Sequence, residues 1–139
     1  KYITPYYKDL SELLHKHGKV LAMHADNDSR RILRQLKDAG YDMVECFATA
    51  PLVNCTLEEA RREWGTDMII WGGIPSIVLE ESFSDEEFER YMQELFRIIA
   101  PGDAFIMGVS DNVTGPSSFS RIVRIGEMVE EFGHYPVGA

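Results

Sequence analysis

A unit of one short apolar segment followed by one amphipathic segment recurs four times along this chain. The apolar segments are residues 19–26, 42–47, 68–72 and 104–109, and the segment after each has apolar residues at helical spacing. The apolar segments do not alternate apolar and polar residues, which is typical of strands in a parallel sheet that is covered on both faces. The sequence therefore predicts an α/β fold with parallel (β/α) units and right-handed crossovers.

Helix starts are marked by residues that cap helices. Two starts have the spacing of a capping box, Thr56 with Glu59 and Ser84 with Glu87. A third start is predicted at the polar run 27–29, from which a helix would extend to Ala39. Further helices are predicted over 6–17 and 118–132. The side chains expected to face the core in the first two helices of the chain are Tyr7, Leu10, Leu13, Leu14, Ile32, Leu33 and Leu36.

Two architectures fit this order of elements. One is a four-stranded flavodoxin-like sheet, and the other is half of a (β/α)8 barrel, which normally takes about 250 residues. The chain has 139 residues, of which 45% are hydrophobic, and it contains no linker or low-complexity segment. We therefore expect residues 1–139 to form a single domain.

Composition excludes several classes of partner. A net charge of −9 argues against binding to nucleic acid or to an anionic membrane, because both need clustered Lys and Arg. The longest apolar runs fall short of the roughly 20 residues that span a bilayer. Cys46 and Cys55 do not make a disulfide framework, so a cytoplasmic protein is expected. Because the chain begins at Lys1 and ends in Val-Gly-Ala, we expect it to be a fragment of a longer protein.

Polar and small residues stand at the ends of the predicted strands, where parallel α/β proteins bind ligands. These candidates are His24, Asp26, Glu45, Trp71, Gly72, Gly73, Ser110, Asp111 and Asn112. Glu45 is the most informative of them, because a carboxylate in an apolar strand is costly unless it is paired, hydrogen-bonded or metal-bound. A structural ion pair with an Arg, backbone hydrogen bonds and a functional role all remain open for Glu45.

His24 and Asp26 lie two residues apart, so they share one face of the first strand. We expect that face to point inward together with Val20 and Ala22. One imidazole and nearby carboxylates could hold a divalent metal or transfer protons. Two structural alternatives stay open: His24 as a core histidine and Asp26 as a helix cap.

The remaining candidates carry weaker signals. Asp111 has turn residues beside it, so turn formation and a functional role both fit. Gly72 and Gly73 do not belong to a phosphate-binding fingerprint, and we expect them to let the backbone approach a ligand or turn sharply at the barrel mouth. Cys46 is expected to point away from Glu45 and to pack as a small apolar residue.

A series of motifs resembles one known family. The series is, in chain order, VLAMHAD, GYDMVECF, EEARREWG, WGGIP, SDEEFERYMQELFRII, FIMGVSDNV and FGHYP. It is similar to the C-terminal half of the uroporphyrinogen decarboxylase superfamily, which includes the decarboxylase and the corrinoid- and coenzyme-M-type methyltransferases. Cobalamin-independent methionine synthase is related to this superfamily. The resemblance covers nearly the whole chain.

The resemblance implies a (β/α)8 barrel of which this chain supplies about the last four strands and the helix before them. In the methyltransferase branch, a zinc ion is held by a His-x-Cys pair, often an acidic residue, and a later Cys. Here His24 matches the His, Asp26 stands at the first Cys position, and Glu45 matches the acidic residue. Ser110 and Asp111 stand where the later Cys is expected. Thiolates favour zinc, so these replacements leave the identity of the divalent metal open.

The resemblance also implies a function, which is methyl transfer involving a corrinoid or a thiol acceptor. The expected metal ligands are His24, Asp26 and Glu45, the expected catalytic residues are His24, Glu45 and Asp111, and the expected cofactor-binding residues are Trp71, Gly72, Gly73 and Ser110. A small molecule or a corrinoid protein would be the methyl donor. The missing N-terminal half or a second copy would be the structural partner.

Two other functions stay open. The first is tetrapyrrole decarboxylation, but the decarboxylase branch has a His-Gly pair where this chain has Ser110, Asp111 and Asn112. The Arg-rich N-terminal part of that branch also has no counterpart here. The second alternative is a non-catalytic half-barrel that serves binding or assembly. We expect this piece to be inactive by itself.

Overall fold

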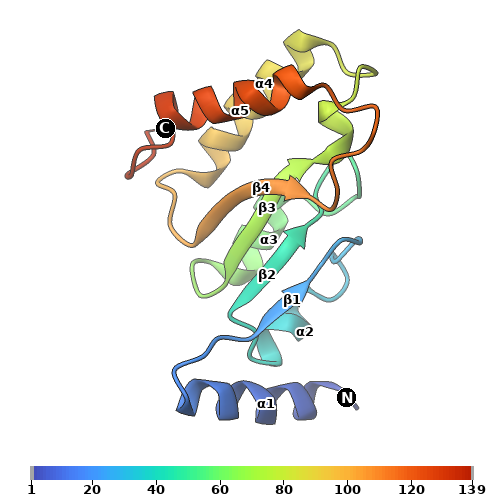
Figure 1. Cartoon of the computed structure of the whole chain (residues 1–139). Coiled ribbons are helices and arrows are strands. Elements are labelled where there is room, and N and C mark those ends of the chain that lie inside the picture. Colours follow the sequence, from blue (N-terminus) through green and yellow to red (C-terminus); the bar gives the residue numbers. More distant parts are fainter. Residues whose placement is uncertain (1, 139) are drawn as a thin grey trace.

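The four predicted strands form one parallel sheet in chain order. A computed structural model describes residues 2–138. Its sheet has the order β1-β2-β3-β4, and each pair of neighbours is parallel (Figure 1). The strands are β1 (Ala22–His24), β2 (Met43–Phe47), β3 (Ile69–Pro75) and β4 (Phe105–Ser110). This α/β architecture is as predicted, but the sequential order differs from that of a flavodoxin-like sheet, in which the second strand lies outside the first.

Helices follow or precede every strand. They are α1 (Thr4–Lys16), α2 (Leu33–Asp38), α3 (Leu57–Trp64), α4 (Asp85–Ile99) and α5 (Phe119–Phe132), with a 3-10 turn η1 (Ser76–Leu79) after β3. Both predicted capping boxes are confirmed, because the Thr56 and Ser84 side chains accept from the backbone N–H groups of Glu59 and Glu87, each at 3.2 Å. Within residues 2–138, no helix is both long and apolar enough to cross a membrane.

Helix α2 is shorter than predicted, which corrects the expected cap at residues 27–29. The helix begins at Leu33, and its N-cap Ile32 makes no side-chain capping bond. The polar run instead forms a local turn in which the Asp28 carboxylate accepts from the Arg30 backbone at 3.1 Å. Short polar side chains compete in this way with helical hydrogen bonds. Ile32 is exposed rather than buried, and Asp26 lies too far upstream to cap the helix.

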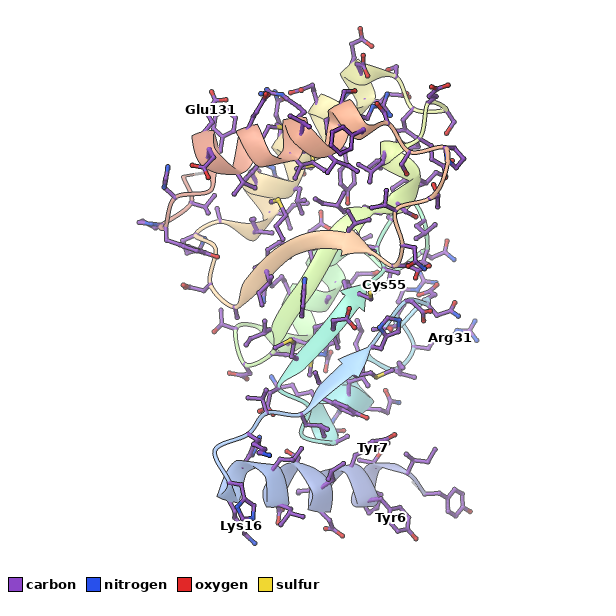
Figure 2. The ribbon with its side chains drawn as sticks, in the orientation of Figure 1. Tyr6, Tyr7, Lys16, Arg31, Cys55 and Glu131 are labelled. Atoms are coloured by element: carbon purple, nitrogen blue, oxygen red, sulfur yellow. The ribbon has the colours of Figure 1, made fainter. Side chains whose placement is uncertain are left out.

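Helix α1 lies beside the β1 edge, and its inward face matches the predicted one only in part (Figure 1). Its buried residue is Ser11, whose hydroxyl donates to the Gly40 carbonyl at 2.6 Å. Tyr7 points toward the body of the protein and packs its ring 5.2 Å from that of Tyr41, whereas Tyr6 points away (Figure 2). Leu10 and Leu13 are exposed, so the inward line follows residues 7, 11 and 14.

The core lies between one face of the sheet and helices α2, α3 and α4. Val44, Phe47 and Ile70 of the sheet are fully buried in a single cluster with residues of these three helices. Trp64 of α3 anchors the layer, since its indole N–H donates to the Leu33 carbonyl at 2.8 Å. Figure 1 shows α2 and α3 behind the sheet and no helix in front of β1–β3. The sheet is therefore covered on one face only in this part of the molecule.

The uncovered face carries exposed apolar side chains. Trp71 and Ile106 are register partners on β3 and β4, and they are 43% and 42% exposed. The first strand contributes Ala22 and His24 to the same face, because they pair in register with Met43 and Glu45. The prediction of strands buried on both faces is wrong for this face.

At the C-terminal edge of the sheet, the end of β4 contacts the end of β2 at Phe47. Ser110, the last residue of β4, donates its hydroxyl to the Phe47 carbonyl at 2.6 Å, although β3 lies between the two strands in the sheet. Gly72 makes this close approach possible: a Cβ there would lie 2.8 Å from the Phe47 backbone N and O. Gly72 and Gly73 have φ values of 149° and 88°, which L side chains rarely adopt. Gly72 lets the backbone of β2 approach closely, whereas Gly73 lies against the side chains of Phe105 and Leu95, and the expected approach to a ligand stays a prediction.

We predict that Gly72→Ala lowers the free energy of unfolding by about 1–3 kcal/mol, since the new methyl group would strain the backbone and collide with Phe47. Urea unfolding followed by tryptophan fluorescence measures this change. The control is Gly126→Ala in α5, where a Cβ meets no atom within 4 Å. That variant should be stabilised by up to about 1 kcal/mol because alanine is the better helix former. Equal stabilities of the two variants would contradict the close approach.

Candidate functional site

His24 and Glu45 form an ion pair on the uncovered face of the sheet. Their Cα atoms are register partners on β1 and β2, and Nδ1 of His24 lies 2.6 Å from Oε2 of Glu45. The His24 side chain is 57% exposed and that of Glu45 is 32% exposed. His24 was expected to face inward, but the neighbours that are buried are Leu21 and Ala25. His24 is therefore exposed in this chain, because the helices cover the opposite face of the sheet.

The pair shifts the pKa values of both partners. The hydrogen bond to Glu45 raises the pKa of His24 above its ordinary value, and the charges of Glu45, Asp26 and Asp111 act in the same direction against the effect of burial. The Cys46 thiol and then the His24 imidazole hold the pKa of Glu45 below its usual range. Glu45 therefore has a histidine partner and not the Arg partner that the sequence left open.

Cys46 belongs to this cluster, which the sequence did not predict. Its φ is 55°, and the register between β2 and β3 shifts between Val44 and Phe47. This bulge gives the strand an extra residue, so Phe47 turns to the helix-covered face while Cys46 stays beside Glu45. Burial, the Glu45 carboxylate and nearby charge raise the pKa of the Cys46 thiol to about 11. The expectation that Cys46 points away from Glu45 is wrong.

Two further carboxylates reach His24 from its other side. Nε2 of His24 lies 3.8 Å from Oδ2 of Asp26. Asp111 follows β4 directly with a φ of 66°, and its carboxylate accepts from the Asn112 amide at 2.9 Å. Donor atoms of His24, Asp26 and Asp111 all lie within 4.8 Å of one another. Asp111 therefore lies at a bend after β4 and also stands in the cluster.

The four predicted cofactor-binding residues are engaged in packing. Ser110 is fully buried and its hydroxyl is bonded to the Phe47 carbonyl. Gly72 and Gly73 fit against Phe47 and Phe105. The Trp71 indole stands over Gly108, where a Cβ would lie 3.0 Å from its Nε1. The structure thus gathers His24, Asp26, Glu45 and Asp111, and it gives Trp71, Gly72, Gly73 and Ser110 structural contacts next to them.

A cavity opens beside His24. It has a volume of about 530 Å³ and lies between α1, α2 and β1. Its walls are mainly apolar and include Tyr7, Met23, Ile32 and Tyr41, with His24 among the few polar residues. Cavities of this size and character hold small ligands. This cavity can therefore hold a small molecule beside β1, next to His24.

Comparisons with known proteins add no relative: the sequence matches no model of a protein family and no curated protein. What can be inferred about function therefore depends on the geometry around His24.

We predict that Glu45→Gln lowers the pKa of His24, since it removes the first cause of the raised value. NMR of the imidazole protons against pH measures the midpoint, which should lie above 6.5 in the parent chain and fall in the variant. The stability that protonated His24 contributes is full below pH 6.5 and is lost as the pH rises through its raised pKa. The control is Glu130→Gln on α5. Unchanged midpoints in both variants would contradict the ion pair.

Proposed function

We propose that this chain is half of a (β/α)8 barrel of the uroporphyrinogen decarboxylase superfamily and acts in methyl transfer to or from a corrinoid or a thiol. The strand order β1-β2-β3-β4 supports a half-barrel, because a (β/α)8 barrel places its parallel strands in chain order. The single layer of helices also fits, since barrel helices lie on the outer face alone. The uncovered face would then be the barrel interior.

A half-barrel needs a partner. Strands β1 and β4 are the edges of the sheet, and within residues 2–138 each leaves one side without a strand neighbour. Trp71 and Ile106 add exposed apolar surface on the inner face. The four strands that close the barrel would come from the N-terminal half of a longer protein or from a second copy. This apolar face also fits the alternative of a non-catalytic assembly module.

The main support for methyl transfer is the position of the His24–Glu45 pair. It lies at the C-terminal edge of the sheet, where parallel α/β enzymes hold their substrates. A methyl acceptor such as a thiol must lose its proton as its sulfur bonds to the methyl carbon. His24 would take that proton, and the bond from the methyl group to the donor would break with its electron pair left on the donor. Glu45 and Asp26 would stabilise the resulting imidazolium.

The residues also fit a divalent metal. The ligands proposed from the sequence, His24, Asp26 and Glu45, supply one imidazole and two carboxylates, with His24 2.6 Å from Glu45 and 3.8 Å from Asp26. Such donors suit a divalent ion of intermediate or hard character. With an ion bound, His24 would serve as a ligand and not as the base, and the ion would supply Lewis-acid chemistry that lowers the pKa of an acceptor thiol.

We predict that the assembled chain transfers the methyl group of methylcobalamin to mercaptoethanesulfonate and that the isolated monomer does not. Fractions from size-exclusion chromatography are assayed by the loss of cobalt–methyl absorbance. His24→Ala should lower the rate about 100-fold or more because it removes the general base. The rate should increase as the pH rises through the raised pKa of His24, since the neutral imidazole accepts the proton.

The matched control is His134→Ala, since His134 is exposed near the C-terminal end of the chain and should leave the rate unchanged. A chain that stays monomeric would contradict closure by a second copy. An assembled chain without transfer, or equal losses in the two variants, would contradict the proposed activity.

A further inference from the structure

Cys46 places a sulfur next to two other kinds of metal-binding atom. One donor atom each of His24, Glu45 and Cys46 lies within 4.8 Å of the other two. Imidazole nitrogen, carboxylate oxygen and thiolate sulfur together form a donor set typical of zinc. The bulge in β2 produces this set, because an unbroken strand would point Cys46 and Glu45 to opposite faces.

The orientation of His24 decides which of its nitrogens faces this set. Nδ1 is the atom next to Glu45, at 2.6 Å, so Nδ1 faces the Glu45–Cys46 side. Nε2 faces Asp26 at 3.8 Å. A carboxylate that receives the second N–H of a ligating histidine fixes the ring and raises its basicity. Asp26 lies on the Nε2 side at 3.8 Å, which is beyond hydrogen-bond length, so it would become such an outer support if its carboxylate moved closer to Nε2.

The backbone of Asp111, which follows β4, acts to lower the pKa of the Cys46 thiol and so opposes the other influences on that pKa. The backbone of β2 positions both Glu45 and Cys46, and ligands on strands are held more accurately than ligands on loops.

A second set competes for His24. Asp26 and Asp111 also have donor atoms within 4.8 Å of a His24 nitrogen, and this set contains no sulfur. All three of its members are exposed, whereas Glu45 and Cys46 are half-buried. An oxygen-rich exposed set favours hard ions, and the sulfur-containing set favours zinc. The set with Glu45 and Cys46 is less exposed, so we expect its side chains to be held more firmly than those of the oxygen-rich set.

We propose that His24, Glu45 and Cys46 form a three-ligand site for a zinc-type cation, with Cys46 bound as the thiolate and one position open to a small molecule. Three protein ligands with an open position are the usual arrangement of a catalytic zinc site. The inference rests on the proposed function only in placing this ion at the methyl-transfer site. It changes the ligand set expected from the sequence, in which Asp26 took the third position.

The test is a titration of the metal-free chain with Co²⁺, which replaces Zn²⁺ and is visible by absorption. We predict a near-ultraviolet thiolate-to-cobalt band that saturates at one equivalent and disappears when Zn²⁺ is added. Cys46→Ser should remove the band and weaken binding by about 100-fold, at least as much as the 10–100-fold caused by outer-support changes. Asp26→Asn, which alters only such a support, should keep the band and weaken binding less.

The matched control is Cys55→Ser. Cys55 is fully buried and its sulfur contacts the Thr56 carbonyl at 3.8 Å, so this variant should keep the band. The spectrum of the parent chain is informative even where a variant fails to fold. Bound Co²⁺ without the band, lost in Asp111→Asn and kept in Cys46→Ser, would overturn the inference in favour of the oxygen-rich set. A folded chain that binds no Co²⁺ would also overturn it.

Different results would contradict the metal site and the methyl-transfer activity. A thiolate band in a chain that shows no methyl transfer would support the metal site and contradict the proposed activity. Methyl transfer that is equal in the parent chain and in Cys46→Ser would support the activity and contradict the role of Cys46.

Discussion

The contact between the ends of β2 and β4 determines the geometry of the whole C-terminal edge. The Ser110 hydroxyl bonds to the Phe47 carbonyl across the line of β3, and Gly72 leaves the space that this approach needs. The next residue after Ser110 is Asp111, and the residue before Phe47 is Cys46. The contact therefore brings a carboxylate from the last strand to a thiol and a carboxylate from the second strand. A flat sheet of the same strands would hold these groups apart.

The uncovered face of the sheet holds both the His24–Glu45 site and the apolar surface that a partner would bury. His24 and Glu45 are accessible because no helix covers them, and the same absence of a cover leaves Trp71 and Ile106 exposed. A partner that closed the sheet would bury this apolar surface and would also reduce the access of water to the ion pair. Electrostatic interactions strengthen when water is excluded. Assembly and chemistry are therefore expected to depend on each other.

Much of the fold could be predicted because it follows from local rules. The two capping boxes set the starts of α3 and α4, and the strand–helix alternation indicated a parallel sheet. The errors have non-local causes. The inward face of α1 depends on Ser11 meeting Gly40, which is 29 residues away, and the start of α2 depends on a turn that competes with the helix.

The site could be predicted in part. Strand-end position identified His24, Asp26, Glu45 and Asp111, because the carboxyl ends of parallel strands meet at one edge. Cys46 was missed because the rule of alternation assigns it to the opposite face, and the bulge that breaks the rule arises where β2 meets the glycines of β3. Ser110 was expected to contact a cofactor, but its hydroxyl holds the Phe47 carbonyl.

The most direct test of this account is a set of proton–proton distances from nuclear Overhauser spectra of the labelled, metal-free chain. We predict cross-peaks from the Asp111 amide to the Cys46 side chain and from Ser110 to Phe47. Their presence would establish that β2 and β4 meet at the C-terminal edge. Cross-peaks from Ser110 only to its register partner Pro75, with none from Ser110 or Asp111 to β2, would show that the strand ends stay apart and would contradict the site.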